Sequence, residues 1–203
     1  MTSTPPPAHV SARPSEARER LLATSMRVFY AEGIHAVGVD RVIAEAQVTR
    51  ATFYRHFPSK EDLVRAYVEA TDQNIRATMA RAAQMTDEPG ELLMLMVHGI
   101  GEEVCRPGFR GCPFINAAAE YPDADHPVRQ AVTAHRAWFH DTLTSLLTRA
   151  GHPDPERAAR TLFLLRDGAM VAGYLGDAEQ ARLALARGTE TLIKPAYQDR
   201  HSA

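Results

Sequence analysis

The chain has 203 residues, of which 45% are hydrophobic, and its formal net charge at pH 7 is −2. This length and composition allow one or two globular domains with a buried core, and no apolar run reaches the roughly 18 residues of a membrane-spanning helix. The N-terminus lacks the basic-then-apolar pattern of a secretory signal, so we expect a cytoplasmic protein with no membrane partner.

The first 14 residues are set apart by their composition, since four of them are proline. Such a segment buries too little apolar surface to join a core, so we predict a disordered N-terminal arm over 1–14.

The charge is also unevenly distributed. Residues 1–60 hold eight Lys or Arg against five Asp or Glu, a net charge of +3, whereas residues 61–203 are acidic. A local basic face is enough for nucleic-acid binding, so the overall charge does not exclude it.

Three apolar patterns with helical spacing follow the arm. The first covers 15–32 and stops at Gly33, a residue suited to the C-terminal cap position. The second covers 40–46, and the third begins at Thr49, whose hydroxyl can cap it. A helix, a short helix, a tight turn and a further helix form a helix-turn-helix on a three-helix core.

The third pattern, over 49–57, has the residue order of a helix that lies in DNA. Phe53 and Phe57 stand four apart, so one side packs inward and the polar side chains face outward. The outward arginines can bond guanine edges or phosphates, the hydroxyl and imidazole groups can donate to phosphate oxygens, and the alanine can touch a thymine methyl. The predicted DNA-binding residues, including a lysine at the start of the next helix, are Thr49, Arg50, Ala51, Thr52, Tyr54, Arg55, His56 and Lys60.

The positions that carry a family resemblance fall within residues 20–63 and are Leu21-Leu22, Phe29, Gly33, Val39-Asp40, Ile43-Ala44-Glu45-Ala46, Val48, Thr52-Phe53-Tyr54, His56-Phe57 and Ser59-Lys60-Glu61-Asp62-Leu63. In this register the chain resembles the TetR/AcrR family of bacterial transcriptional regulators. Gln47 departs from the family pattern, because glycine is usual in this turn. Either a side chain at positive φ there costs about 1 kcal/mol, or the turn differs slightly from that of the family. Gly38 stands where a capping Ser or Thr is frequent, although glycine is a permitted N-cap.

Beyond residue 62 the apolar spacing is helical, and no strand pattern or internal repeat is present. We therefore predict an all-α fold, in which an N-terminal three-helix helix-turn-helix domain precedes a larger helical ligand-binding and dimerisation domain. The predicted divisions are the arm over 1–14, the DNA-binding domain over 15–62, the regulatory and dimerisation domain over 63–195, and a C-terminal tail over 196–203. We expect the last helix to end before Pro195.

The predicted helix over 155–175 has two apolar faces, one of which carries small residues that permit close backbone approach. Together with the helix over 178–193 it suits a two-fold four-helix bundle between two copies of the chain. A single buried helix in a monomer is the alternative. The predicted interface residues are Leu165, Gly168, Ala172, Gly176 and Leu185.

A ligand cavity is predicted where the inward helix faces of the larger domain converge. Aromatic and methionine side chains with a few polar groups suit an uncharged or amphipathic organic ligand, although each residue taken singly is more often plain core. The predicted ligand-binding residues are Met94, His98, Phe114, Asn116, Glu120, His135, Trp138, Phe139, Phe163, Met170 and Tyr174.

An enzyme or metal site is the competing interpretation of His98, His135 and Glu120. No two of them have a chelating helical spacing, and no nucleophile motif or phosphate loop accompanies them. We therefore expect no catalytic residue, metal or cofactor. Cys105 and Cys112 match no zinc or Cys-x-x-Cys spacing, which favours reduced structural thiols over a redox pair.

The sequence thus favours a repressor whose homodimer binds a palindromic double-stranded DNA operator and is released by a small organic ligand. An activator, a redox-responsive regulator and a small-molecule enzyme on an all-α scaffold are the alternatives.

Overall fold

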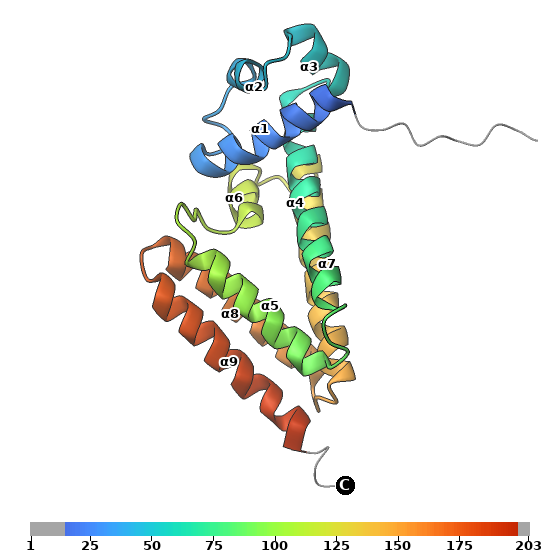
Figure 1. Cartoon of the computed structure of the whole chain (residues 1–203), viewed down its shortest axis with the longest axis vertical. Coiled ribbons are helices and arrows are strands. Elements are labelled where there is room, and N and C mark those ends of the chain that lie inside the picture. Colours follow the sequence, from blue (N-terminus) through green and yellow to red (C-terminus); the bar gives the residue numbers. More distant parts are fainter. Residues whose placement is uncertain (1–14, 199–203) are drawn as a thin grey trace, which may run out of the picture.

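The computed structural model describes residues 15–198, and every regular element in that range is an α-helix (Figure 1). The all-α prediction is therefore confirmed for the described residues. The nine helices found there are α1 (Glu16–Glu32), α2 (Val39–Glu45), α3 (Arg50–His56), α4 (Lys60–Ala82), α5 (Pro89–Val104), α6 (Pro113–Glu120), α7 (Pro127–Arg149), α8 (Pro155–Tyr174) and α9 (Ala178–Gln198). The predicted arm over 1–14 and residues 199–203 of the predicted tail lie outside the described range.

Helices α1, α2 and α3 form a small bundle at one end of the molecule (Figure 1). Leu21, Val42 and Phe53 are fully buried in its core, as their helical spacing requires. The start of α3 is capped as predicted, because Thr49 Oγ1 accepts a hydrogen bond from the backbone N–H of Thr52 at 3.1 Å. The three helices therefore have the predicted helix-turn-helix order.

The turn between α2 and α3 contains a residue in the left-handed conformation, Gln47, with φ 52°. The backbone N–H of Gln47 donates to Ala44 O, and that of Val48 donates to Ile43 O, each at 3.2 Å. This pair of hydrogen bonds is the Schellman pattern that closes a helix C-terminus, and its left-handed position is usually glycine. The prediction that Gln47 occupies positive φ is thus confirmed.

Helix α4 connects the small bundle to the rest of the molecule (Figure 1). Ser59 caps it, since its Oγ accepts from the backbone N–H of Asp62 at 3.0 Å. The first turns of α4 belong to the core of the small bundle, where the ring of Tyr67 packs edge-on against Phe29 with 5.8 Å between centroids. Its 23 residues make a rod about 35 Å long. The later turns therefore reach well into the larger domain.

Helices α5, α8 and α9 pack against one another at the far end, and α7 runs beside α4 and also contacts α8 (Figure 1). Leu93, Leu143, Leu162 and Leu185 are fully buried between these helices. The larger domain thus buries many apolar residues of its own, which form one continuous core with those of the helix-turn-helix.

Two of the predicted dimer-interface residues, Leu165 and Leu185, pack against other residues of the same protomer. Leu185 is only 1% exposed and belongs to the core formed by α5, α8 and α9. Leu165 packs against α9, where a Cβ on Gly188 would lie 2.9 Å from its Cδ1. Apolar periodicity shows that a face is buried but does not show what buries it, so the sequence could not separate these residues from Gly168 and Gly176, which face open space.

The predicted end of the last helix is wrong, because α9 continues past Pro195 to Gln198. A proline in a helix removes one backbone hydrogen bond. Here it falls in the final turn, where the helix continues without that bond.

Replacing Gln47 with glycine should stabilise the protein. Glycine adopts a left-handed φ without a Cβ clash, so Gln47→Gly should raise the free energy of unfolding by about 1 kcal/mol, measured by urea denaturation. Gln84→Gly is the matched control. Gln84 is exposed and outside the left-handed region, so glycine there should be neutral or destabilising. Equal shifts in the two variants would contradict strain at Gln47.

Candidate DNA-binding face and regulatory cavity

The outer side of α3 presents the predicted DNA-binding residues. Phe53 and Phe57 are buried, whereas Arg50, Ala51 and Arg55 are exposed. Of the remaining predicted residues, Thr49 and Tyr54 are exposed, and Thr52, His56 and Lys60 are partly exposed. The predicted division into inward aromatic and outward polar residues is present, and it leaves this polar face accessible to a groove of DNA.

Two cations of this face, Arg50 and Lys60, have acidic neighbours. Arg50, in the first turn of α3, forms an ion pair with Asp40 of α2. Both side chains are mostly exposed, so the pair is weak and can be exchanged for a base or phosphate. Partial burial lowers the pKa of Lys60, with Glu61 and Glu120 opposing the shift.

Glu120 joins the larger domain to the helix-turn-helix domain. Its Oε1 accepts from the backbone N–H of Ile34 at 2.8 Å, and its Oε2 accepts from that of His35 at 2.5 Å. These amides belong to the two residues that follow Gly33, the C-terminal cap of α1. Glu120, predicted to orient a ligand, instead lies at the contact between the two domains.

A second link between the domains comes from Tyr30 on α1. Its Oη donates to the backbone carbonyl of Gly111 at 3.0 Å and accepts from the backbone N–H of Arg110 at 2.9 Å. Tyr30 therefore ties α1 to the segment just before α6, and Glu120 ties the loop after α1 to the end of α6.

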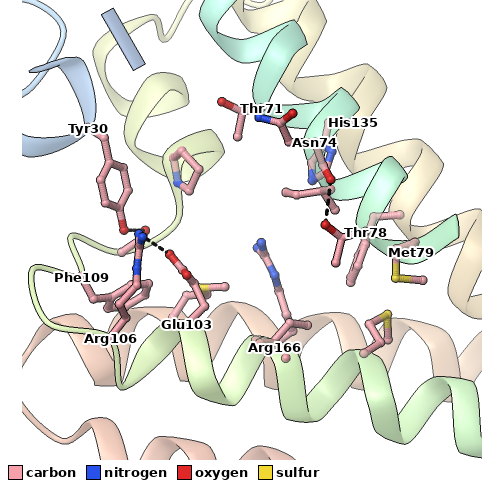
Figure 2. Close-up of a pocket in the computed structure, with 18 of the residues that line it drawn as sticks. Tyr30, Thr71, Asn74, Thr78, Met79, Glu103, Arg106, Phe109, His135 and Arg166 are labelled. Atoms are coloured by element: carbon pink, nitrogen blue, oxygen red, sulfur yellow. Dashed lines mark hydrogen bonds and ion pairs between the residues drawn. The ribbon is translucent and has the colours of Figure 1, made fainter. Parts of the chain in front are cut away.

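A cavity of about 560 Å³, partly open to solvent, lies between α4, α5, α7 and α8 and is also bordered by Met26 and Tyr30 of α1 (Figure 2). Its volume suits one small organic molecule. The apolar residues that line it are Met26, Ile75, Met79, Ala82, Leu95, Met96, Ile100, Phe109, Phe139 and Met170. The residues with polar side chains that line it are Tyr30, Tyr67, Thr71, Asn74, Thr78, Glu103, Arg106, His135 and Arg166.

Three of the eleven predicted ligand residues line this cavity, namely His135, Phe139 and Met170. Phe114 lies behind the wall, with its ring stacked on His135 at 3.5 Å between centroids. Trp138 and Phe163 instead pack against the guanidinium groups of Arg76 and Arg136. These aromatic residues support the wall from outside.

The other predicted residues lie elsewhere. His98 and Tyr174 are exposed, and Met94 is half-buried outside the cavity. Asn116 Nδ2 donates to the backbone carbonyl of Arg110 at 2.8 Å and so shapes the loop before α6. Because α5 is apolar on nearly all sides, its sequence pattern does not indicate which side borders an open space.

The sequence analysis missed the contribution of α4, whose later turns form a whole wall of the cavity. Thr71, Asn74 and Thr78 recur at helical spacing on one side of α4, next to Ile75 and Met79. Asn74 and Thr78 are exposed, so this stripe also fits an ordinary half-exposed helix, and the sequence contained no specific signal for the cavity.

His135 is buried at the edge of the cavity and joins a partly exposed polar network. Its Nδ1 lies 2.7 Å from Asp72 Oδ1, and Arg76 Nε donates to Asp72 Oδ2 at 2.6 Å. Burial lowers the pKa of His135, and the Asp72 carboxylate only partly offsets this shift. Burial alone would raise the pKa of Asp72, but its hydrogen bonds with Arg76 and His135 bring it below the usual value. At neutral pH a neutral imidazole thus faces an ionised carboxylate.

Arg166 is a charged residue in the interior, only 7% exposed. Its Nη1 donates to Asp167 Oδ1 at 2.8 Å and to Cys112 Sγ at 3.3 Å. Burial works against the charged form, but the neighbouring Cys112 sulfur and Asp167 carboxylate outweigh it, and the pKa of the guanidinium lies above its usual value. Arg166 is therefore a fixed positive charge beside the cavity.

Within residues 15–198, no group of three or more His, Cys, Asp or Glu side chains could hold a metal ion. None of the described helices combines the length and hydropathy needed to cross a membrane. Cys105 is an exposed free thiol and Cys112 a buried one. The prediction of reduced structural thiols, with a redox pair as the alternative, stays a prediction.

A helix-turn-helix with an exposed polar recognition helix, carried on a larger helical domain, defines the class of DNA-binding transcriptional regulators. Residues 21–67 match the family model described as bacterial regulatory proteins, tetR family, and residues 102–187 match the tetracyclin repressor-like C-terminal domain. The chain belongs to the TetR family, as its sequence predicted.

Similar structures support this assignment over most of the chain. The crystal structure of SCO4454, a TetR-family transcriptional regulator from Streptomyces coelicolor, is 50% identical with a TM-score of 0.85, covering 89% of this chain and 96% of that one. A putative TetR regulator from Streptomyces avermitilis is 27% identical with a TM-score of 0.77, over 89% and 98% of the two chains. The regulator LmrA of Bacillus subtilis is 26% identical over 126 residues, 61% of this chain and 67% of LmrA.

The buried imidazole predicts a loss of stability in weak acid. Because the pKa of His135 is lower in the folded state than its ordinary value of 6.5, the unfolded state binds a proton first. This contribution of His135 to the free energy of unfolding is intact above about pH 6.5 and decreases as the pH falls below that value. His135→Gln should flatten this fall between about pH 7 and pH 5 in urea denaturation.

The exposed His98 supplies a control for this experiment, since His98→Gln should leave the pH dependence of unfolding as it is in the wild type. Identical pH profiles for His135→Gln and wild type would exclude His135 as the source of the acid sensitivity.

Proposed function

We propose that this protein is a homodimeric repressor that binds a palindromic operator and is released when a small organic ligand enters the cavity between α4, α5, α7 and α8. The observation that carries the proposal is the position of α4. Its first turns belong to the DNA-binding domain, and its later turns line the cavity. A ligand that fits a different position of α4 would therefore favour a different position of the recognition helix.

The links made by Glu120 and Tyr30 support the same proposal. They join α6 and the loop before it to α1, while Gly111 and Pro113 beside α6 line the cavity. A ligand can shift such an equilibrium only by its difference in affinity for the two arrangements, and DNA must weaken ligand binding by the same factor.

A second copy of the chain fits best against the outer face of α8 and α9. Leu164 and Leu175 are 71% and 78% exposed and flank the half-exposed Val171. These positions lie on one side of α8, next to a shallow apolar groove lined by Gly168 and Ala172. Burying this strip against its two-fold copy would form a four-helix bundle. Such a dimer could place two α3 helices in successive major grooves, roughly 34–36 Å apart.

The whole proposal can be tested with DNA fragments. Fragments bound by the protein should be selected from a genomic pool, and the preferred one should contain an inverted repeat. Addition of cavity ligands found by thermal-shift screening should then weaken binding to that fragment. Ligands that bind but leave or increase the operator affinity would contradict release by ligand and favour an activator or a corepressor-dependent regulator.

Within the DNA-binding face, we expect Arg50 to read a base and Lys60 to hold the backbone. Arg50→Ala should cost about 1–3 kcal/mol on the selected operator and relax specificity at one position. Lys60→Ala should weaken operator and random DNA alike and flatten the salt dependence by about one unit. Fluorescence anisotropy over a range of salt concentrations measures both. An equal loss on both DNAs for Arg50→Ala would remove Arg50 from base recognition.

The dimer predicts that a charge on the exposed side of α8 separates the protomers. Val171→Arg would bury an unpaired charge in the interface, which costs several kcal/mol, so light scattering should show monomers and operator binding should fall. Met85→Arg is the control, because Met85 is 75% exposed in the connection after α4. If Val171→Arg remains dimeric at micromolar concentration, the interface lies elsewhere.

A further inference from the structure

The Arg166 guanidinium is a buried positive charge at the wall of the cavity. Figure 2 shows its side chain extending from α8 into the space between the α4 wall and the wall that carries Tyr30, Glu103 and Arg106. It is only 7% exposed, and a charged group in such a place costs free energy unless it is paired and hydrogen-bonded. The cost of burying Arg166 therefore depends on its hydrogen-bond and ion-pair partners.

The hydrogen bonds of Arg166 are incomplete among the described residues. Both of them come from Nη1, to Asp167 Oδ1 at 2.8 Å and to Cys112 Sγ at 3.3 Å. The Nε atom is buried and has no hydrogen-bond partner. A thiol is a weak acceptor compared with a carboxylate. A guanidinium with donors left over is suited to a planar, bidentate acceptor.

The charges around Arg166 are not balanced. Asp167 is shared, because Arg136 Nη2 also donates to its Oδ2 at 2.8 Å. Among the described residues that line the cavity, Glu103 is the only carboxylate, and Arg106 Nη2 donates to it at 2.7 Å. The nearby Asp72 carboxylate is paired with Arg76 and hydrogen-bonded to His135. One positive charge beside the cavity thus lacks a carboxylate of its own.

The rest of the cavity suits the apolar part of a ligand. Ile75, Met79 and Met96 line it, and the ring of Phe139 lies 5.6 Å from the guanidinium carbon of Arg166. The hydroxyl of Thr71 is already used, since it donates to the backbone carbonyl of Tyr67 at 2.8 Å. A ligand would therefore find one strong cationic anchor and a mainly apolar surface.

We propose that the cavity selects an organic acid, whose carboxylate binds the Arg166 guanidinium and whose hydrocarbon part lies along α4 and α5. This inference rests on the proposed ligand-binding function and specifies its chemistry. It also narrows the sequence-based expectation of an uncharged or amphipathic ligand to an anionic one.

The test compares acids with neutral molecules of the same shape. Octanoic, decanoic and naphthylacetic acids and their primary amides are titrated into the full-length protein by calorimetry, without DNA. At least one acid should bind the wild type, and more tightly than its amide by at least tenfold. Arg166→Met should lose this difference, and Arg166→Lys should keep part of it. Equal affinities for acid and amide, no binding of any acid, or an unchanged preference in Arg166→Met would each overturn the proposal.

Folding of the variants can be judged separately. Arg166→Met leaves Asp167 paired with Arg136, so the fold should persist and can be checked by circular dichroism. If this variant does not fold, the acid–amide comparison in the wild type and the Arg166→Lys variant still decide the question.

Operator binding separates this inference from the proposed function. Acids that bind through Arg166 without loosening the protein from its operator would leave the anionic site standing and contradict release by ligand. Amides that loosen the complex as well as the acids do would support release and overturn the role of Arg166.

Discussion

The structure depends on one helix that belongs both to the helix-turn-helix domain and to the wall of the cavity. Helix α4 buries Leu63, Val64 and Tyr67 in and next to the helix-turn-helix domain, and then continues as a wall of the cavity. A continuous helix with all its backbone hydrogen bonds made is stiff over this length, so a tilt at one end appears at the other. Glu120 and Tyr30 make a second connection through α6 and the loop before it, so the small domain is attached to the larger one at two places.

The sequence predicted the DNA-binding half well, because that half is specified by local chemistry. Caps at Thr49 and Ser59, the spacing of Phe53 and Phe57, and the positive φ at Gln47 all involve residues within a few positions of one another. Such features follow from hydrogen-bond geometry and helical periodicity, so they can be predicted before any tertiary contact is known.

The larger domain was predicted in outline only, because its site depends on contacts between distant residues. Glu120 reaches backbone amides more than 80 positions away, and Arg166 contacts Cys112 across 54 positions. Periodicity indicated that α5 and α8 were buried, but a buried face can border a neighbour, a cavity or a second protomer. Leu185 and Trp138 were misplaced for this reason, and Thr71 and Asn74 of α4 were overlooked.

The ion pair between Arg50 and Asp40 affects how the protein would search along DNA. Before contact, Asp40 competes with phosphates for this guanidinium, although only weakly because both side chains are mostly exposed. At a matching base the guanidinium exchanges one acceptor for another, and the freed carboxylate is left near a negatively charged duplex. At a matching base, the new hydrogen bonds of Arg50 would offset the repulsion between Asp40 and the duplex. At other sequences nothing would offset it. If Arg50 reads a base as proposed, Asp40 beside α3 would therefore favour discrimination between sites over strength of binding.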